Sequence, residues 1–428
     1  MSNTRLQQTA RRMRTHDGNV GAVLADVAVT TFDQLKRYDI PYHEVFFGKP
    51  YADVYVDDLA VHANLDTYQE LGWIAEDDGA DKGLADVQNA KKAGIVASRS
   101  FNHIQIVGQR IVKSSSANQI LGEMFFYSHM PDQVAQYFPT VHEISYMAET
   151  STYSITMQKL KGTTFSHMFV GRSLTSGRLS ALLNTVHGIH TSTAKCTKHL
   201  PIPDELKVLI AKRSFGRDKK PITEDSPELY DNYARKLKSR FEEYNADYAA
   251  LGKQITSSLL NTLVTRLTGY ESDKRATFAQ VIHGDPVFSN AILNEEERKV
   301  YLLDVRSQLG STLTTAGDKT YDLAKILQSL QGYDHVTLAS DEDLREGTAD
   351  EVLARLIQPA DRVMLKDLQD EVYWPFVREN YPEISRSDIL DIVASLLFSL
   401  IPLHREIVRP LFLKMCQNVV EHGCGVPM

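Results

Sequence analysis

The chain has 428 residues, with 47 basic and 55 acidic side chains and a net charge of −8 at pH 7. This length predicts two or three structural units, and the 43% of hydrophobic residues is ordinary for a soluble globular protein. The mild acidity gives no general electrostatic reason to bind nucleic acid. Three cysteines, Cys196, Cys416 and Cys424, are too few and too unevenly placed for a disulfide framework or a zinc ribbon, so we interpret them as free thiols.

Residues 1–74 alternate between helical and β-rich patterns, which is typical of an α/β unit. Apolar residues recur at helical spacing over residues 20–38, and β-rich runs follow at 45–47 and 54–56. The arginine-rich start resembles a mitochondrial transit peptide in outline, but a phosphatase-like interpretation given below explains it better. We therefore expect a cytoplasmic protein, with mitochondria as the alternative. Residues 75–94 are predicted to form a polar linker.

A second region, residues 95–165, carries strand patterns at 103–107, 110–113 and 154–158, with a predicted helix over 117–130. Residues 166–428 are predicted to be mostly helical and contain one β-rich island, residues 278–304.

The most apolar stretch, residues 393–403, is flanked closely by charges and is too short to cross a bilayer. We interpret it as a buried helix and expect neither a membrane nor a nucleic-acid partner.

The β-rich island contains the most informative motif of the sequence. An apolar strand is predicted to deliver His283, Gly284 and Asp285 into a loop, Asn290 follows five residues later, and a second apolar strand ends in Asp304. Phosphoryl transfer needs one carboxylate that accepts the proton of the attacking hydroxyl, and oxygen ligands for the magnesium ions that bridge the phosphates. The spacing therefore favours phosphotransferase chemistry.

This H-G-D-x-x-x-x-N loop, the following strand that ends in Asp, and a G-D-x-x-Y-D-L-A segment at residues 317–324 resemble the aminoglycoside phosphotransferase and choline kinase family. That family is a branch of the protein-kinase-like fold. The resemblance implies that Asp285 is the catalytic base, that Asn290 and Asp304 are Mg²⁺ ligands, and that Asp322 braces the catalytic loop. The sequence departs from the family at residues 305–306, where many relatives have an aromatic residue and a glycine.

The resemblance also implies an α+β, two-lobed fold. Residues 95–165 would form a small antiparallel-sheet lobe that binds ATP, and residues 166–428 a helical lobe that holds the catalytic loop and the acceptor pocket. In such a lobe a strand lysine reaches the phosphates and a helix glutamate holds it. Lys113 and Glu123 are our candidates, and the alternative is that both are solvated surface charges.

The remaining nucleotide contacts are predicted from position more than from motif. The turn that covers the phosphates would lie near residues 99–102, which contain no glycine-rich motif. Residues 157–160 fit the passage from the sheet to the hinge, so Gln158 and Leu160 are candidates for contacts with adenine. An ordinary strand end explains the same residues equally well.

The N-terminal region resembles the later part of a haloacid dehalogenase-like phosphatase of the kind joined to capsule-biosynthesis proteins. The resemblance makes Thr9 a phosphate-contacting hydroxyl, Lys49 a phosphate-neutralising cation, and Asp57 and Asp58 metal-holding acids; solvated acids at a strand end are the alternative. These phosphatases need an upstream D-x-D nucleophile, which this chain lacks, so no phospho-aspartyl intermediate can form. We expect a truncated, phosphatase-inactive remnant or an incomplete gene model.

The leading hypothesis is an ATP- and Mg²⁺-dependent kinase that phosphorylates a hydroxyl of a sugar, amino-alcohol or related metabolite, in the context of polysaccharide or cell-surface metabolism. A pseudokinase-like binding or regulatory module is the second hypothesis, and a phosphatase acting through the N-terminal fragment is a disfavoured third. A basic cluster at residues 212–220 could meet an anionic substrate, although a solvated loop explains it better. The sequence does not indicate the oligomeric state.

Overall fold

The computed structural model describes residues 6–9, 15–16, 19–38, 40, 44–47, 103–217 and 219–426. The chain divides into two compact units, residues 1–97 and 98–428, and each is described by itself. The predicted strand at 54–56, the predicted linker, the phosphate-covering turn near 99–102, and Lys49, Asp57 and Asp58 all lie outside the described residues.

The first unit contains a β-α-β arrangement. Strand β1 (Leu6–Thr9) pairs in parallel with β2 (Glu44–Phe47), and helix α1 (Val20–Arg37) connects them. The Asn19 side chain caps the helix by accepting a hydrogen bond from the Ala22 amide at 3.1 Å. Val23 and Val27 form the buried stripe of the helix, and Phe47 packs against them. The α/β pattern of the sequence is therefore present in the described part of this unit.

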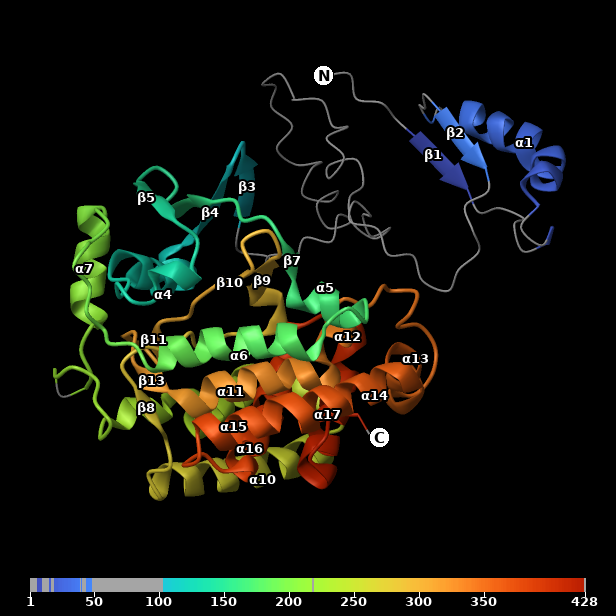
Figure 1. The fold of residues 1–428 in the computed structure, drawn as a ribbon. Coiled ribbons are helices and arrows are strands. Elements are labelled where there is room, and N and C mark those ends of the chain that lie inside the picture. Colours follow the sequence, from blue (N-terminus) through green and yellow to red (C-terminus); the bar gives the residue numbers. More distant parts are fainter. Residues whose placement is uncertain are drawn as a thin grey trace. The chain divides into compact units, whose positions relative to one another are not determined.

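The second unit begins with a four-stranded antiparallel sheet in the order β3-β4-β6-β5. Its strands are β3 (His103–Val107), β4 (Arg110–Ser116), β5 (Val141–Met147) and β6 (Thr152–Gln158). Figure 1 labels its strands β3, β4 and β5. Strand β5 was not predicted from the sequence. It pairs with β6 through a register shift between Val141 and Glu143, and only Ile144 on it is fully buried, so its alternation gives a weak signal.

Helix α4 (Ala117–Ser128) follows β4 directly and packs on the sheet. Its apolar face, which includes Leu121 and Met124, is fully buried. A Cβ atom at Gly122 would lie 2.1 Å from the carbonyl oxygen of Arg306, so only glycine allows this close approach to the segment that follows Asp304. The helix is thereby held against the part of the chain that carries the predicted metal ligand.

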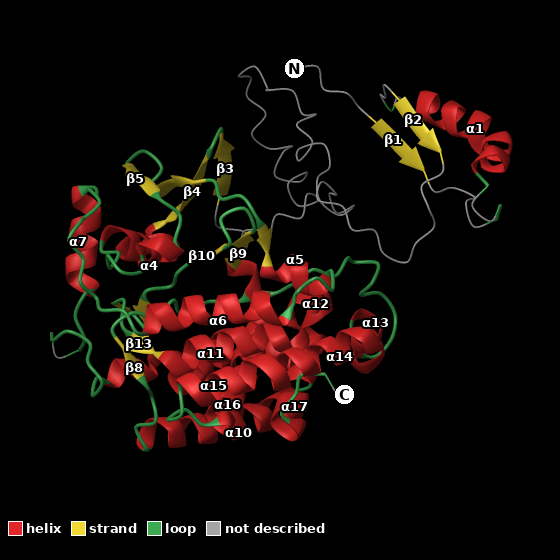
Figure 2. Ribbon diagram, in the orientation of Figure 1, coloured by secondary structure: helices red, strands yellow, loops and turns green. Residues whose placement is uncertain are grey.

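The rest of the second unit is predominantly helical (Figure 2). Its first helices are α5 (Phe165–Val170), α6 (Ser176–His190), α7 (Asp204–Arg213), α8 (Lys236–Glu243), α9 (Asn245–Ala250) and α10 (Lys253–Ser272). The later ones are α11 (Lys319–Gln328), α12 (Asp334–Thr337), α13 (Ala349–Leu356), α14 (Pro359–Asp367), α15 (Trp374–Asn380), α16 (Arg386–Leu400) and α17 (Arg409–His422). One continuous hydrophobic core joins these helices to the sheet.

The predicted buried helix at residues 393–403 is confirmed, because α16 and the short 3₁₀ turn after it bury nearly every side chain of this stretch. Within the described ranges, no helix combines the length and the apolar character needed to span a bilayer. The predicted antiparallel sheet and helical portion are both present, and the fold is α+β.

The β-rich island differs from the prediction in one respect. Strand β8 covers only Phe278–Ala279, and residues 280–287 form a loop instead of an apolar strand. The backbone amides of His283 and Gly284 donate to the carboxylate of Asp322, so they are not available for a strand ladder. Strands β9 (Ala291–Asn294) and β10 (Lys299–Leu302) then form an antiparallel hairpin that precedes Asp304.

Candidate active site

Two carboxylates hold the amino group of Lys113. Its Nζ lies 2.6 Å from Oε2 of Glu123 on α4 and 2.6 Å from Oδ1 of Asp304. Lys113 and Glu123 are buried, so the alternative of two solvated surface charges does not describe them. Burial alone would lower the pKa of Lys113, but the carboxylates of Glu123 and Asp304 outweigh it and raise that pKa. The lysine is therefore held as a cation between the sheet lobe and the end of the β9–β10 hairpin.

Asp304 and Asn290 present oxygen atoms from adjacent segments. The amide of Leu303 donates to the carbonyl of Asn290 at 2.8 Å, which ties the two segments together. The side-chain amide of Asn290 donates to the carbonyl of Asp285 at 2.9 Å, so its Oδ1 remains available to a cation. Asp304 has a φ of 56°, an uncommon left-handed conformation for a non-glycine residue, and its side chain is 54% exposed.

These oxygen atoms fit a magnesium ion. Asp304 and Asn290 together offer a carboxylate and an amide oxygen, and Mg²⁺ characteristically takes one or two such protein ligands and completes its shell with water and substrate phosphates. No cluster of three or more His, Cys, Asp or Glu side chains suited to a metal occurs in the described part of the chain.

The loop that carries Asp285 is fixed by its own residues. The amide of Asp285 donates to Nδ1 of His283 at 3.1 Å, which leaves the proton of the neutral imidazole on Nε2. Burial lowers the pKa of His283, which favours this neutral form. Gly284 has a φ of +81°, and a Cβ there would lie 2.8 Å from Cβ of Arg306. A glycine is therefore required between His283 and Asp285.

Asp322 links helix α11 to this loop. Its Oδ2 accepts from the His283 amide at 2.7 Å and lies 3.1 Å from Nε2 of His190, while its Oδ1 accepts from the Gly284 amide at 2.7 Å. His190 in turn contacts the hydroxyl of Tyr381 at 2.8 Å. The carboxylate is fully buried and its position matches the bracing role that the resemblance implies for it.

We expect Asp322→Asn to lower the free energy of unfolding by about 3 kcal/mol, because an amide nitrogen would replace an oxygen that now accepts from a buried backbone amide. Chemical denaturation monitored by circular dichroism measures this change. The control is Asp225→Asn, whose carboxylate is exposed and lies 3.5 Å from the exposed Lys274, and it should change stability little. Equal stabilities for the two variants would contradict the bracing role.

Helix α11 also places a lysine on the candidate base, which the sequence analysis missed. Nζ of Lys325 lies 2.9 Å from Oδ1 of Asp285, and the lysine is buried. Lys325 follows Asp322 by three residues and therefore lies on the same side of the helix. That spacing from a residue already assigned to the loop was the signal available in the sequence.

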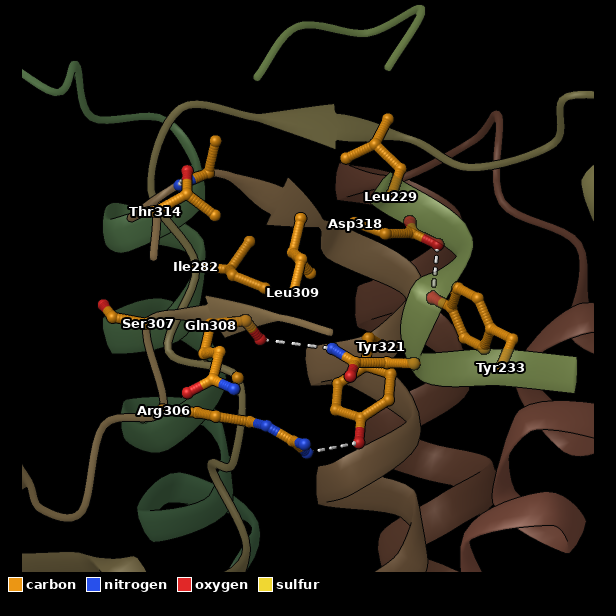
Figure 3. A pocket seen from close by; sticks show the side chains of 13 residues that line it. Leu229, Tyr233, Ile282, Arg306, Ser307, Gln308, Leu309, Thr314, Asp318 and Tyr321 are labelled. Atoms are coloured by element: carbon orange, nitrogen blue, oxygen red, sulfur yellow. Dashed lines mark hydrogen bonds between the residues drawn. The ribbon is translucent and has the colours of Figure 1, made fainter. Parts of the chain in front are cut away.

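Two further cations meet at the hydroxyl of Tyr321 on the same helix. Nη1 of Arg306 donates to it at 3.2 Å, and Nζ of Lys236, the first residue of α8, donates at 3.4 Å. Figure 3 shows the Arg306 guanidinium directed at Tyr321, beside a pocket that Ile282 and Leu309 also line. Neither cation was identified from the sequence, although residue 306 was noted as a departure from the family.

The first aspartate of the G-D-x-x-Y-D-L-A segment anchors the start of α11. Asp318 caps the helix by accepting from the Thr320 amide at 3.0 Å, and its other oxygen accepts from the hydroxyls of Tyr233 and Tyr270. Figure 3 shows the contact with Tyr233. Burial raises the pKa of Asp318, while these hydrogen bonds act in the opposite direction. The contacts fix the helix that carries Tyr321, Asp322 and Lys325.

The predicted adenine contacts lie at the end of β6. Gln158 is the last residue of the strand, and its backbone amide donates a hydrogen bond to the carbonyl of Thr140 at 2.8 Å. Leu160 follows the strand and is half-buried. Thr9 is the last residue of β1 in the separate N-terminal unit. The adenine role of Gln158 and Leu160 and the phosphate role of Thr9 stay predictions.

Comparisons with known proteins give distant likenesses only. No family model matches the chain, and no curated protein matches its sequence. Among solved structures, an aminoglycoside phosphotransferase of Streptomyces rimosus, in complex with ADP and streptomycin, is 15% identical with a TM-score of 0.38, over 69% of this chain and 87% of that one. A glucosamine kinase in complex with glucosamine, ADP and inorganic phosphate is 9% identical with a TM-score of 0.44, over 75% and 76%.

An amicoumacin kinase in complex with AMP-PNP and Ca²⁺ is 8% identical with a TM-score of 0.38, over 80% of this chain and 96% of that one. These likenesses are too distant to assign an activity, so the function has to be argued from the site itself.

Proposed function

We propose that the chain is an ATP- and Mg²⁺-dependent phosphotransferase that phosphorylates a hydroxyl group of a small molecule. The observation that carries this proposal is the chain of contacts from Glu123 through Lys113 to Asp304, with Asn290 and Asp285 on the adjoining loop. A cation fixed by two carboxylates, beside oxygen ligands for a metal, is the arrangement that binds a polyphosphate for transfer.

Each group has a defined part in the proposed reaction. Lys113 would bind the α- and β-phosphates, and Glu123 would hold it in place. Asn290 and Asp304 would hold Mg²⁺, which neutralises charge on the phosphates when it is bound. The acceptor oxygen would form a bond to the γ-phosphorus as the bond to ADP breaks, and the acceptor proton would move to the carboxylate of Asp285. Gln158 and Leu160 would contact the adenine.

A pseudokinase is the second candidate, and one contact favours it. The carboxylate of Asp285 is paired with Lys325 at 2.9 Å, and this cation competes with the acceptor hydroxyl for the carboxylate oxygen. Slow turnover with intact nucleotide binding would be the consequence. The two candidates share the nucleotide site and differ only in the rate of transfer.

For the N-terminal unit we propose a haloacid dehalogenase-like α/β fold. The parallel β1–β2 pair with α1 between the strands supports an α/β origin. Thr9 at the end of β1 would be the phosphate-contacting hydroxyl, with Lys49, Asp57 and Asp58 in the roles that the resemblance implies. The cytoplasm is the proposed compartment.

ATP binding and ADP release test the proposed function. We expect the purified full chain to bind ATP in the presence of Mg²⁺ and to release ADP faster when a hydroxyl acceptor is added. Calorimetry measures the first, and a coupled ADP assay with sugars, polyols, choline and ethanolamine measures the second. Binding without acceptor-dependent release would favour the pseudokinase, and failure to bind ATP would contradict both candidates.

A further inference from the structure

The side of Asp285 that faces the helices is strongly cationic. Lys325, Lys236 and Arg306 come from three separate elements, and they are linked through Asp285 and the Tyr321 hydroxyl. Within the described residues, Lys325 pairs with Asp285, while neither Lys236 nor Arg306 lies within 4 Å of a carboxylate oxygen. Three basic side chains are therefore grouped here, one on the Asp285 carboxylate and two on the Tyr321 hydroxyl.

Holding these cations together has an electrostatic cost. Burial and the charges of Arg306, Arg240 and Lys325 hold the pKa of Lys236 well below its usual range, and Asp285 offsets this only in part. Lys236 and Arg306 share one neutral phenol oxygen, and Nζ of Lys236 also lies 5.9 Å from the centroid of the Tyr321 ring. An anion placed between them would lower that cost, because buried or half-buried charges are stable when they are paired.

Two of these cations lie on helices, and Arg306 follows the proposed metal ligand Asp304 by two residues. Lys113, which would bind the ATP phosphates, belongs to the sheet. Lys236 begins α8, Lys325 lies on α11, and the pocket beside Arg306 is lined only by residues between 229 and 321. This side of Asp285 belongs to the helical portion, where the hydroxyl acceptor would approach the catalytic base.

From this juxtaposition we infer that the acceptor carries an anionic group, a phosphate or a carboxylate, close to the hydroxyl that is phosphorylated, and that Lys236 and Arg306 bind it. The inference rests on the proposed function, because it assigns the acceptor side of the same site. Phosphorylated sugars, phosphorylated polyols and sugar acids meet this requirement. Cationic acceptors such as choline, ethanolamine and aminoglycosides do not, because the like charges would repel one another.

Matched acceptor pairs test the preference. We expect glycerol 3-phosphate or glycerate to be used with a kcat/KM at least about tenfold above that of glycerol, and glucose 6-phosphate or gluconate above glucose, since one charge-assisted hydrogen bond is worth about that factor. A preference for the neutral member of each pair, or for choline, would overturn the inference while leaving the kinase proposal intact.

A binding experiment decides the same question without an identified acceptor. Sulfate is titrated into the full chain saturated with Mg²⁺ and AMP-PNP, which fills the γ-phosphate position and leaves the acceptor side free. We expect sulfate to bind, and Lys236→Gln to weaken this binding about tenfold. Lys238→Gln is the matched control, because Lys238 lies on the same helix with an exposed side chain.

The variants keep the outcome unambiguous. Lys236→Arg preserves the charge and should retain sulfate binding, which separates loss of charge from loss of folding. Equal sulfate affinities for Lys236→Gln and Lys238→Gln, or no sulfate binding to the nucleotide complex, would overturn the inference. If AMP-PNP does not bind, the proposed function fails on its own, and sulfate titration of the nucleotide-free chain then decides the anion site with the same variants.

Discussion

Asp285→Asn is expected to lower turnover by about 10²- to 10⁴-fold, the range that a positioned general base contributes. The asparagine keeps the size of the side chain, but its amide cannot accept the proton of the attacking hydroxyl. The backbone of residue 285 keeps its bonds to His283 and Asn290, so the loop should keep its shape. ADP release with the best acceptor measures the loss, and ATP affinity with Mg²⁺ should change by less than about threefold.

The control for this variant is Asp225→Asn, which removes one carboxylate at an exposed position. Its turnover should equal that of the parent chain. The turnover of Lys325→Met is a second comparison, because this variant removes the cation that pairs with Asp285. If Asp285→Asn kept full turnover, another group would have to accept the proton, and the assignment of the base would be wrong.

The residues with a fixed motif spacing were within reach of sequence analysis. Asp285, Asn290 and Asp304 are separated by short chain distances, and the two segments that carry them are joined by a backbone hydrogen bond. Lys113 and Glu123 could be proposed from the sequence because Lys113 ends the predicted strand 110–113 and Glu123 lies on the predicted helix that follows. The contact of Lys113 with Asp304, 191 positions away, depends on tertiary packing that no local pattern reports.

The cations on the acceptor side were out of reach for the same reason. Lys236 lies in a charged, helical region where most lysines are solvated, and nothing in its neighbours distinguishes it from Lys238. Its contact with Tyr321 on α11 is made across 85 positions of the chain and depends on tertiary packing. Arg306 was visible as a departure from the family pattern, but its direction depends on the turn that follows Asp304.

The local errors also have physical causes. The short apolar run before His283 predicts a strand, because such runs are typical of buried strands, and its side chains are indeed buried. The carboxylate of Asp322 takes the amides of His283 and Gly284, and this replaces the strand ladder by side-chain hydrogen bonds. Strand β5 was missed because the register shift between Val141 and Glu143 breaks the alternation of its side chains. Pattern analysis detects burial and periodicity more readily than it detects the hydrogen-bond partner.

Asp304→Asn is expected to raise the Mg²⁺ concentration for half-maximal ATP binding by at least about tenfold, since even indirect partners of a metal ligand contribute 10–100-fold to metal affinity. Turnover at low Mg²⁺ should fall with it. Glu123→Gln is the matched control, because it removes the other carboxylate from Lys113 and leaves the metal oxygens in place. It should lower turnover without shifting the Mg²⁺ dependence. Calorimetric ATP titrations over a series of Mg²⁺ concentrations compare the two variants. An equal shift in both would mean that Asp304 acts by positioning Lys113, and the shift in Asp304→Asn alone would mean that it binds the metal.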